Sequence, residues 1–79
     1  MENQKIIDSF NKNSVEEVRI SLNKWKNQDY IDIRVWTSLN SDDSEKKIPT
    51  KKGVTLNVDF IPNLQKALEK AAKELNQEK

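Results

Sequence analysis

The sequence of 79 residues contains neither cysteine nor histidine. Without cysteine there is no disulfide and no thiolate metal site, and without histidine the commonest metal ligand and general base is missing. No apolar run approaches the about 20 residues needed to cross a bilayer, and residues 1–5 lead into no signal-peptide core. No nucleophile and base stand in a recognisable motif. These absences predict an intracellular protein that is not an enzyme, needs no cofactor or metal, and has no membrane partner.

The small size of the chain bounds its stability. A chain of this length forms one domain, and a single core of this size is marginal without additional stabilisation. Because disulfides and metal sites are excluded, oligomerisation is the remaining usual way to stabilise so small a core. The 14 basic and 13 acidic residues leave a formal net charge of +1. The net charge therefore argues only weakly for a polyanionic partner, and the positions of the charges have to decide.

Two central segments, residues 18–25 and 30–36, alternate with a period of two. Their apolar positions are Val18, Ile20, Leu22, Ile31, Ile33 and Val35. This period places the apolar side chains on one face of each of two strands. The strands are expected to form a hairpin with a four-residue turn over residues 26–29, where Asn and Asp supply turn chemistry.

The opposite face of these strands is rich in aromatic and basic side chains. Its residues are Arg19, Ser21, Asn23, Trp25, Tyr30, Asp32, Arg34 and Trp36. Aromatic rings stack on unpaired bases and arginines neutralise phosphates, so this face indicates binding of single-stranded nucleic acid. The alternative is that Trp25 and Trp36 are half-buried packing residues. Asp32 is expected to orient Arg19 or Arg34 as a cross-strand partner.

The segments on either side of the hairpin carry weaker signals. Residues 1–15 are polar and are expected to form a flexible arm, with a short helix over residues 3–11 as the rival, so that the domain covers residues 16–79. Residues 38–47 are expected to form a solvated loop. Residues 46–50 indicate a short edge strand containing Pro49, and residues 54–58 a further strand. Gly53, the only glycine, is expected to relieve a bulge or a positive φ, or to admit a ligand close to the backbone.

Two charged clusters lie between the hairpin and the last strand. The acidic residues of segment 42–45 have oxygens that could bind a metal, but the segment lacks the glycine of a calcium loop, so a solvated loop is expected. Residues 46–53 include four lysines and no acidic residue, and these are Lys46, Lys47, Lys51 and Lys52. We expect lysines here to contact phosphates, the alternative being a merely solvated loop.

The last third of the sequence predicts an amphipathic helix. Its apolar stripe consists of Ile61, Leu64, Leu68, Ala71 and Leu75, at spacings of three and four residues. Pro62 fits only a first turn, so the helix should start within residues 58–62, with Asn57 or Asp59 as the cap. The stripe must cover the apolar face of the sheet. Either the helix packs only on its own sheet, or part of the stripe forms a homodimer interface made by Leu64, Leu68, Ala71 and Leu75.

Several of these features occur together in one known family. The Ile-Asp-Ile-Arg run at 31–34, the hairpin before it, the acidic loop after it and the Pro-Thr-Lys-Lys-Gly-Val-Thr-Leu segment at 49–56 resemble the positive-cofactor-four family of single-stranded-DNA-binding transcriptional coactivators. The resemblance covers about residues 16–75. It implies an α+β fold, a curved four-stranded antiparallel sheet followed by one C-terminal helix. It also implies a helix-mediated homodimer that binds unpaired DNA on the exposed sheet face and its basic edge.

The resemblance also implies site residues. The family's strand aromatic corresponds to Trp25, its Ile-Asp-Ile-Arg arginine to Arg34, and its basic pair before glycine to Lys51 and Lys52. The sequence departs from the family pattern at two positions. It has Asn23 where the family often has a basic residue, and the single aromatic Trp36 where the family often has two consecutive aromatics. The sequence does not decide which face of the strand Trp36 occupies. The predicted single-stranded-DNA-binding residues are Asn23, Trp25, Lys26, Arg34, Trp36, Lys51, Lys52 and Gly53.

Together these features predict a homodimer that binds single-stranded DNA without sequence preference, in transcription, replication or recombination. Transcription or replication proteins are further expected partners. The alternative is a protein-interaction module that uses the C-terminal helix, with nucleic-acid binding incidental. The chain lacks the Ser/Lys-rich tail that eukaryotic members carry, which favours a prokaryotic or viral source and a location in the cytoplasm or nucleoid, the nucleus being expected for a eukaryotic source.

Overall fold

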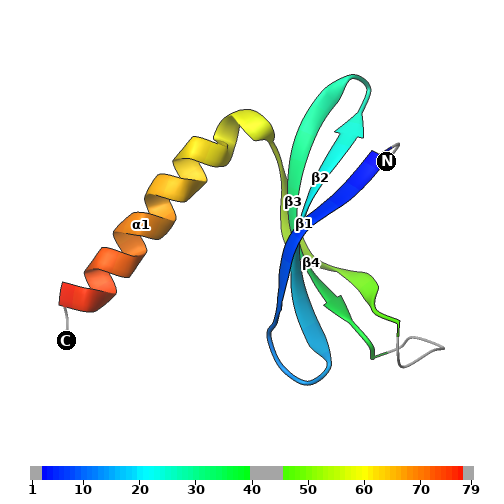
Figure 1. The fold of residues 1–79 in the computed structure, drawn as a ribbon, viewed down its shortest axis with the longest axis horizontal. Helices are drawn as coiled ribbons and strands as arrows, with labels where there is room; N and C mark the ends of the chain where they lie inside the picture. The colour runs from blue at the N-terminus through cyan, green and yellow to red at the C-terminus, as the bar shows by residue number, and fades with distance from the viewer. Residues whose placement is uncertain (1–2, 40–45, 78–79) are drawn as a thin grey trace.

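The computed structural model describes residues 3–39 and 46–77. One antiparallel sheet, in the order β1-β2-β3-β4, is formed by β1 (Asn3–Asn11), β2 (Glu16–Trp25), β3 (Gln28–Thr37) and β4 (Ile48–Asn57). The 3-10 turn η1 (Val58–Phe60) then leads into the helix α1 (Ile61–Gln77). Figure 1 shows a twisted sheet with the helix projecting to one side. The predicted four-stranded sheet with one C-terminal helix is thus confirmed.

The β2–β3 hairpin has the predicted register but a shorter turn. The apolar pairs across it are Val18 with Val35, Ile20 with Ile33, and Leu22 with Ile31. The turn consists of Lys26 and Asn27 alone, with φ of 50° and 64°. Positive φ at both central residues is the geometry of a type I′ turn, which matches the twist of the strands that it joins. The predicted four-residue turn is therefore wrong, because Trp25 and Gln28 already form the last pair.

The N-terminal segment forms an edge strand where an arm or a short helix was expected. Strand β1 pairs with β2, and Phe10 lies opposite Val18. The register shifts between Ile6 and Asp8, which makes the intervening residue part of a β-bulge. A bulge interrupts the alternation of side chains, so the adjacent Ile6 and Ile7 hid the period of two that would have predicted a strand.

Strand β4 unites the two short segments that the sequence predicted separately. Its pairing with β3 shifts between Arg34, opposite Gly53, and Trp36, opposite Pro49, so residues 50–52 of β4 form a bulge opposite the single residue Val35. Gly53 does not have a positive φ. A Cβ added there would lie 2.5 Å from the Ile33 carbonyl oxygen and 2.8 Å from Arg34 Cα. Gly53 is therefore required by the close approach of β4 to the backbone of β3.

Replacing Gly53 with Ala should destabilise the protein. The added methyl group meets backbone atoms that cannot rotate away, and overpacking of this kind costs about 1–3 kcal/mol of unfolding free energy. Urea unfolding at fixed protein concentration measures the effect. Lys51→Ala, an exposed change in the same bulge, serves as the control and should shift the unfolding free energy by less than about 0.5 kcal/mol. An unchanged midpoint for Gly53→Ala would show that the strand spacing relaxes freely.

The helix begins where the sequence predicted. The Asn57 side chain accepts a hydrogen bond from the Asp59 backbone N–H (2.9 Å) and so caps η1. Pro62 is the second residue of α1, where its missing N–H has no intrahelical acceptor to lose. The described part of the chain contains no helix with the length and apolar character needed to span a membrane.

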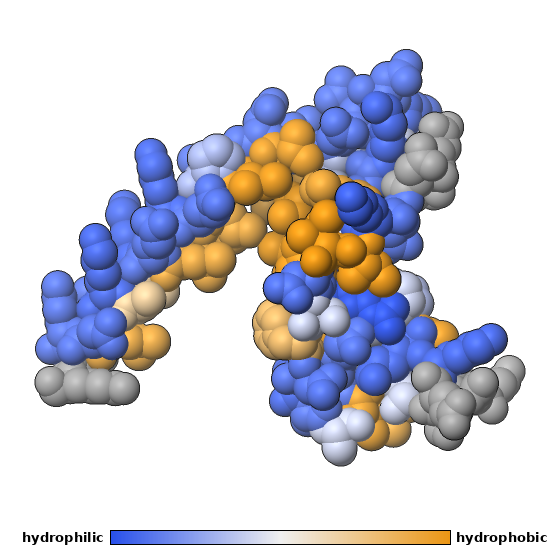
Figure 2. All heavy atoms as spheres, in the orientation of Figure 1, coloured by the Kyte–Doolittle hydropathy of each residue, from blue (hydrophilic) through white to orange (hydrophobic). Residues whose placement is uncertain are grey.

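The helix does not cover the sheet of its own chain. Among the described residues, Ile31 is the only buried apolar side chain, at 9% exposed, whereas Leu68 and Leu75 on α1 are 62% and 63% exposed. Figure 2 shows apolar residues along the side of the helix that faces the sheet and on the adjoining sheet, with open space between them. The expectation that the stripe packs on its own sheet is therefore wrong for the single chain.

The exposed area is correspondingly large. The chain exposes 6463 Å², whereas a compact protein of its 9.2 kDa exposes about 4,900 Å². The excess of roughly 1,500 Å² is larger than the ~800 Å² that each partner buries in a standard protein–protein interface.

Candidate nucleic-acid interface

The candidate interface is the sheet face opposite the apolar one, which we call the polar face. On β2 and β3 it carries Glu17, Arg19, Ser21, Asn23, Trp25, Gln28, Tyr30, Asp32, Arg34 and Trp36. The unbroken β2–β3 register places Glu17 opposite Trp36 and Arg19 opposite Arg34. Trp36 therefore lies on the same face as Arg34, which settles the question that the sequence left open.

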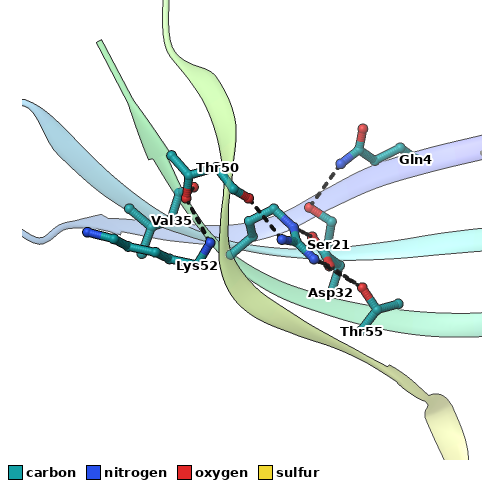
Figure 3. Close-up of polar contacts among 8 residues, drawn as sticks. Gln4, Ser21, Asp32, Val35, Thr50, Lys52 and Thr55 are labelled. Carbon is teal, nitrogen blue, oxygen red and sulfur yellow. Dashed lines mark hydrogen bonds and ion pairs between the residues drawn. The ribbon is translucent and has the colours of Figure 1, made fainter. Parts of the chain in front are cut away.

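Arg34 is fixed at the centre of this face by a network of hydrogen bonds (Figure 3). Its Nε and Nη2 donate to the two carboxylate oxygens of Asp32 at 3.2 and 2.9 Å. Nη2 also donates to Thr55 Oγ1 (3.3 Å), and Nη1 donates to the Thr50 carbonyl oxygen (2.9 Å). Four of the five guanidinium N–H groups are thus used. One guanidinium N–H is left without an acceptor among the described residues, and the other four hold Arg34 in place.

Asp32 is the partner that holds Arg34, but along one strand instead of across strands. The carboxylate is 5% exposed, and it also accepts a hydrogen bond from Thr55 Oγ1 (2.6 Å). A buried carboxylate requires such partners, because an unpaired buried charge is strongly unfavourable. Asp32 thus orients Arg34, one of the two arginines that the sequence offered as its partner.

The β4 bulge presents the lysine pair at the edge of the sheet. Thr50 anchors the bulge, since its Oγ1 donates to the Val35 carbonyl oxygen (2.8 Å) and accepts from the Lys52 backbone N–H (3.1 Å), as drawn in Figure 3. Lys51 and Lys52 are both exposed. Both lysines lie in the bulge of β4, an edge strand of the sheet, where a polyanion can reach them.

One carboxylate lies within electrostatic reach of this edge. The hydrogen bond from Asn13 Nδ2 to Glu16 Oε1 (2.7 Å), with smaller contributions from the charges of Lys12 and Lys52, holds the pKa of Glu16 below its ordinary value. Glu16 therefore stays ionised at neutral pH and offsets part of the positive charge at this end of the sheet.

Trp25 lies at the end of β2 next to the hairpin turn. The residue is 48% exposed, and Lys26 Nζ lies 4.7 Å from the centroid of its ring, within cation–π range. A large aromatic ring that is half exposed, with a cation beside it, is available for base stacking.

Trp36 has a different environment from Trp25. The Arg19 guanidinium lies 4.2 Å above its ring centroid, and Arg19 in turn contacts Glu17 through Nε and Oε1. One face of the indole is therefore occupied by an arginine. We expected the rings of both tryptophans to be available for base stacking. The Trp25 ring is accessible, whereas one face of the Trp36 ring is covered by Arg19.

A hollow of about 310 Å³ on the polar face brings several predicted residues together. It is lined by Gln4, Asn23, Asp32, Arg34, Trp36 and Pro49. Asn23 is 3% exposed, and among the described residues neither its Oδ1 nor the Trp36 Nε1 has a hydrogen-bond partner. Trp25 and Lys26 lie outside this hollow at the hairpin end, and Lys51 and Lys52 lie outside it at the β4 edge.

Four residues of this arrangement are absent from the predicted site. Gln4 comes from β1, which the sequence did not predict as a strand. Thr50 and Thr55 come from the bulged strand β4, whose register opposite β3 could not be derived. Ser21, which is 1% exposed, lies on the face that the sequence predicted. Its hydrogen-bond partner Gln4, whose Nε2 donates to Ser21 Oγ at 3.5 Å, was not predicted.

The remaining predicted features lie elsewhere. The acidic cluster at residues 42–45 is outside the described residues. Within residues 3–39 and 46–77 no group of three or more acidic side chains is placed to hold a metal ion. The predicted dimer residues Leu64, Leu68, Ala71 and Leu75 lie on α1, which projects away from the sheet (Figure 1).

Comparisons with known proteins agree with this architecture. A PC4 homologue from Burkholderia pseudomallei K96243 is similar over 94% of this chain and 96% of its own, with 22% identity and a TM-score of 0.80. A bacteriophage T5 homologue of the eukaryotic transcription coactivator PC4, implicated in recombination-dependent DNA replication, is similar over 94% of this chain and 80% of its own, with 22% identity and a TM-score of 0.69. No curated protein sequence matches the chain. The model of the Transcriptional Coactivator p15 (PC4) family matches residues 12–67, more than half of the chain, and the chain therefore belongs to this family.

Proposed function

We propose that this protein binds single-stranded DNA through the polar face and the lysines at its rim. The observation that supports this most is the position of Trp25. Its half-exposed ring lies beside Lys26 and on the same face as the Arg34 network, with the lysine pair of β4 at the edge. Rings on which bases stack, together with cations along the backbone, are the general means of binding unpaired strands. The role is one of binding and not of catalysis.

The geometry favours unpaired over paired DNA. Trp25 can stack only on a base whose face is free, and in a duplex the base faces are covered by their neighbours. The phosphates are uniform along a strand, so the rim lysines contribute affinity that does not depend on sequence. Most of the binding free energy is therefore independent of the bases.

The biological setting follows from the family. We propose that the protein acts inside the cell where DNA is transiently unpaired, in transcription, replication or recombination. The T5 homologue's description as implicated in recombination-dependent DNA replication and the coactivator description of the family both support a role of this kind.

We also propose that the working form is a homodimer. The apolar stripe of α1 and the apolar sheet face are both uncovered in the single chain, and the excess exposed area of roughly 1,500 Å² is what an obligate interface of 2,000–5,000 Å² for the pair would remove. A second copy supplies matching apolar surfaces through two-fold symmetry.

The exposed helix also supports a second candidate function. A helix whose apolar stripe is uncovered, with Leu68 62% exposed, could serve as the docking surface of a protein-interaction module, with DNA binding incidental. Binding that persists at high salt and does not respond to oligonucleotides would favour this function over the first.

The decisive experiment compares oligo-dT with a duplex of equal length. Single-stranded DNA should bind at least about tenfold more tightly than duplex, because only unpaired bases can stack on Trp25. Tryptophan emission should be quenched on binding. Equal affinity for the two forms, or unchanged emission, would refute the stacking site.

A further inference from the structure

The hollow on the polar face contains a hydrogen-bond acceptor that nothing in the described part of the chain uses. Asn23 lines the hollow, is 3% exposed, and its Oδ1 has no partner in the structure. Leaving a buried polar atom unpaired costs about 1–3 kcal/mol. A ligand that donates a hydrogen bond to this oxygen recovers that cost.

Apart from Trp36 Nε1, a buried donor that also has no partner among the described residues, the other polar groups of the hollow are largely committed. Asp32 and Arg34 bind each other and the two threonines of β4, so their side chains are held in place. Gln4 is exposed, and its hydrogen bond to Ser21 is long, at 3.5 Å. Gln4 can therefore swing aside at little cost, and Asn23 Oδ1 is the buried acceptor that a ligand can satisfy.

The chemistry of a DNA strand decides which part of it can do so. Phosphate and sugar oxygens of DNA are acceptors and cannot donate to Asn23 Oδ1, so the donor has to be a base. The group that projects furthest from the sugar reaches the floor of a hollow first. In cytosine and adenine this group is an exocyclic amine, which donates. In thymine it is a carbonyl oxygen, which would face the asparagine oxygen unfavourably and projects beyond the N3–H, the only donor of that base.

We propose that Asn23 is a base-reading residue that favours an amino-bearing base, cytosine or adenine, over thymine at this one position of the bound strand. The proposal rests on the proposed function and refines it. Stacking and phosphate contacts supply an affinity common to all sequences, and Asn23 adds a modest discrimination. Asparagine thus stands where a basic side chain would contribute charge without reading a base.

Oligo-dC and oligo-dT of equal length test the proposal by anisotropy titration at mildly alkaline pH, where oligo-dC stays unfolded. The wild type should bind oligo-dC about three- to tenfold more tightly than oligo-dT, the effect of one net hydrogen bond. Asn23→Leu, of similar volume, should bind both with the same affinity. Lys24→Gln, at the residue after Asn23 but on the opposite face of β2 and outside this hollow, should keep the wild-type ratio.

A change in the probe tests the same contact without altering the protein. An oligonucleotide of N4,N4-dimethylcytosine lacks the donors, so the wild type should bind it no more tightly than oligo-dT. A ratio near one for the wild type, or a preference that survives in Asn23→Leu or with the dimethylated probe, would overturn the proposal while single-strand binding stands. Failure to bind any single strand would overturn the proposed function as well.

Discussion

Leu68→Glu should convert the protein from a dimer to a monomer or unfold it. Leu68 lies in the middle of the apolar stripe of α1 and is 62% exposed in the single chain. Burying a leucine contributes about 1.5–3 kcal/mol, and the substitution occurs twice in a two-fold dimer. The dimer dissociation constant should rise by at least about a hundredfold even before the cost of burying the carboxylates is counted.

Sedimentation velocity at micromolar concentration, together with circular dichroism, measures this outcome. Lys66→Gln provides the control, because it changes the net charge by the same amount on the opposite side of the helix, and it should leave the dimer intact. The Leu68→Glu variant should also lose more affinity for long oligonucleotides than for short ones, since a dimer can hold two segments of one strand. A wild-type protein that sediments as a folded, fully binding monomer would exclude the dimer.

Trp25→Ala should weaken DNA binding by about 1–3 kcal/mol, the cost of losing one base–aromatic stack. The slope of log K against log salt should be nearly unchanged, because the lysines and arginines that neutralise phosphates are all retained. Anisotropy titrations of oligo-dT at several salt concentrations measure both quantities, and urea unfolding monitors stability. If the substitution lowered stability alone and left the affinity intact, Trp25 would be a packing residue.

The double variant Lys51→Ala/Lys52→Ala should have the complementary effect. It removes cations at the rim, so it should weaken binding to all sequences equally and flatten the salt slope by roughly 0.7 for each phosphate that is no longer neutralised. Lys73→Ala, which removes a lysine from α1 away from the polar face, is the control. A salt slope identical to that of the wild type would show that the bulge lysines do not touch the strand.

Much of this fold was predictable because the two faces of the hairpin differ in chemistry. Strict alternation in β2 and β3 predicted the apolar pairs and the polar face, and the spacing of Leu64, Leu68 and Leu75 predicted α1. Apolar residues recur every two positions in a half-buried strand and every 3.6 positions in an amphipathic helix, and both repeats can be read from a single sequence.

The failures have a common cause, which is irregular backbone. The β1 bulge placed Ile6 and Ile7 in a strand without alternation, and the β4 bulge joined two segments that looked separate. The hairpin turn was shorter because Lys26 and Asn27 adopt positive φ without glycine. The Arg19–Trp36 stack depends on side-chain rotamers that residue spacing does not specify.

The helix that stands clear of its own sheet has a consequence for how the protein responds to its own abundance. If the partner chain supplies the missing half of the core, folding and assembly are one equilibrium, and the melting temperature rises with protein concentration. The 17-residue helix would draw most of its stability from packing of its apolar face, so dilution would cost the chain its structure as well as its partner. The DNA-binding face would then become available above a threshold copy number, which makes dosage itself a means of control.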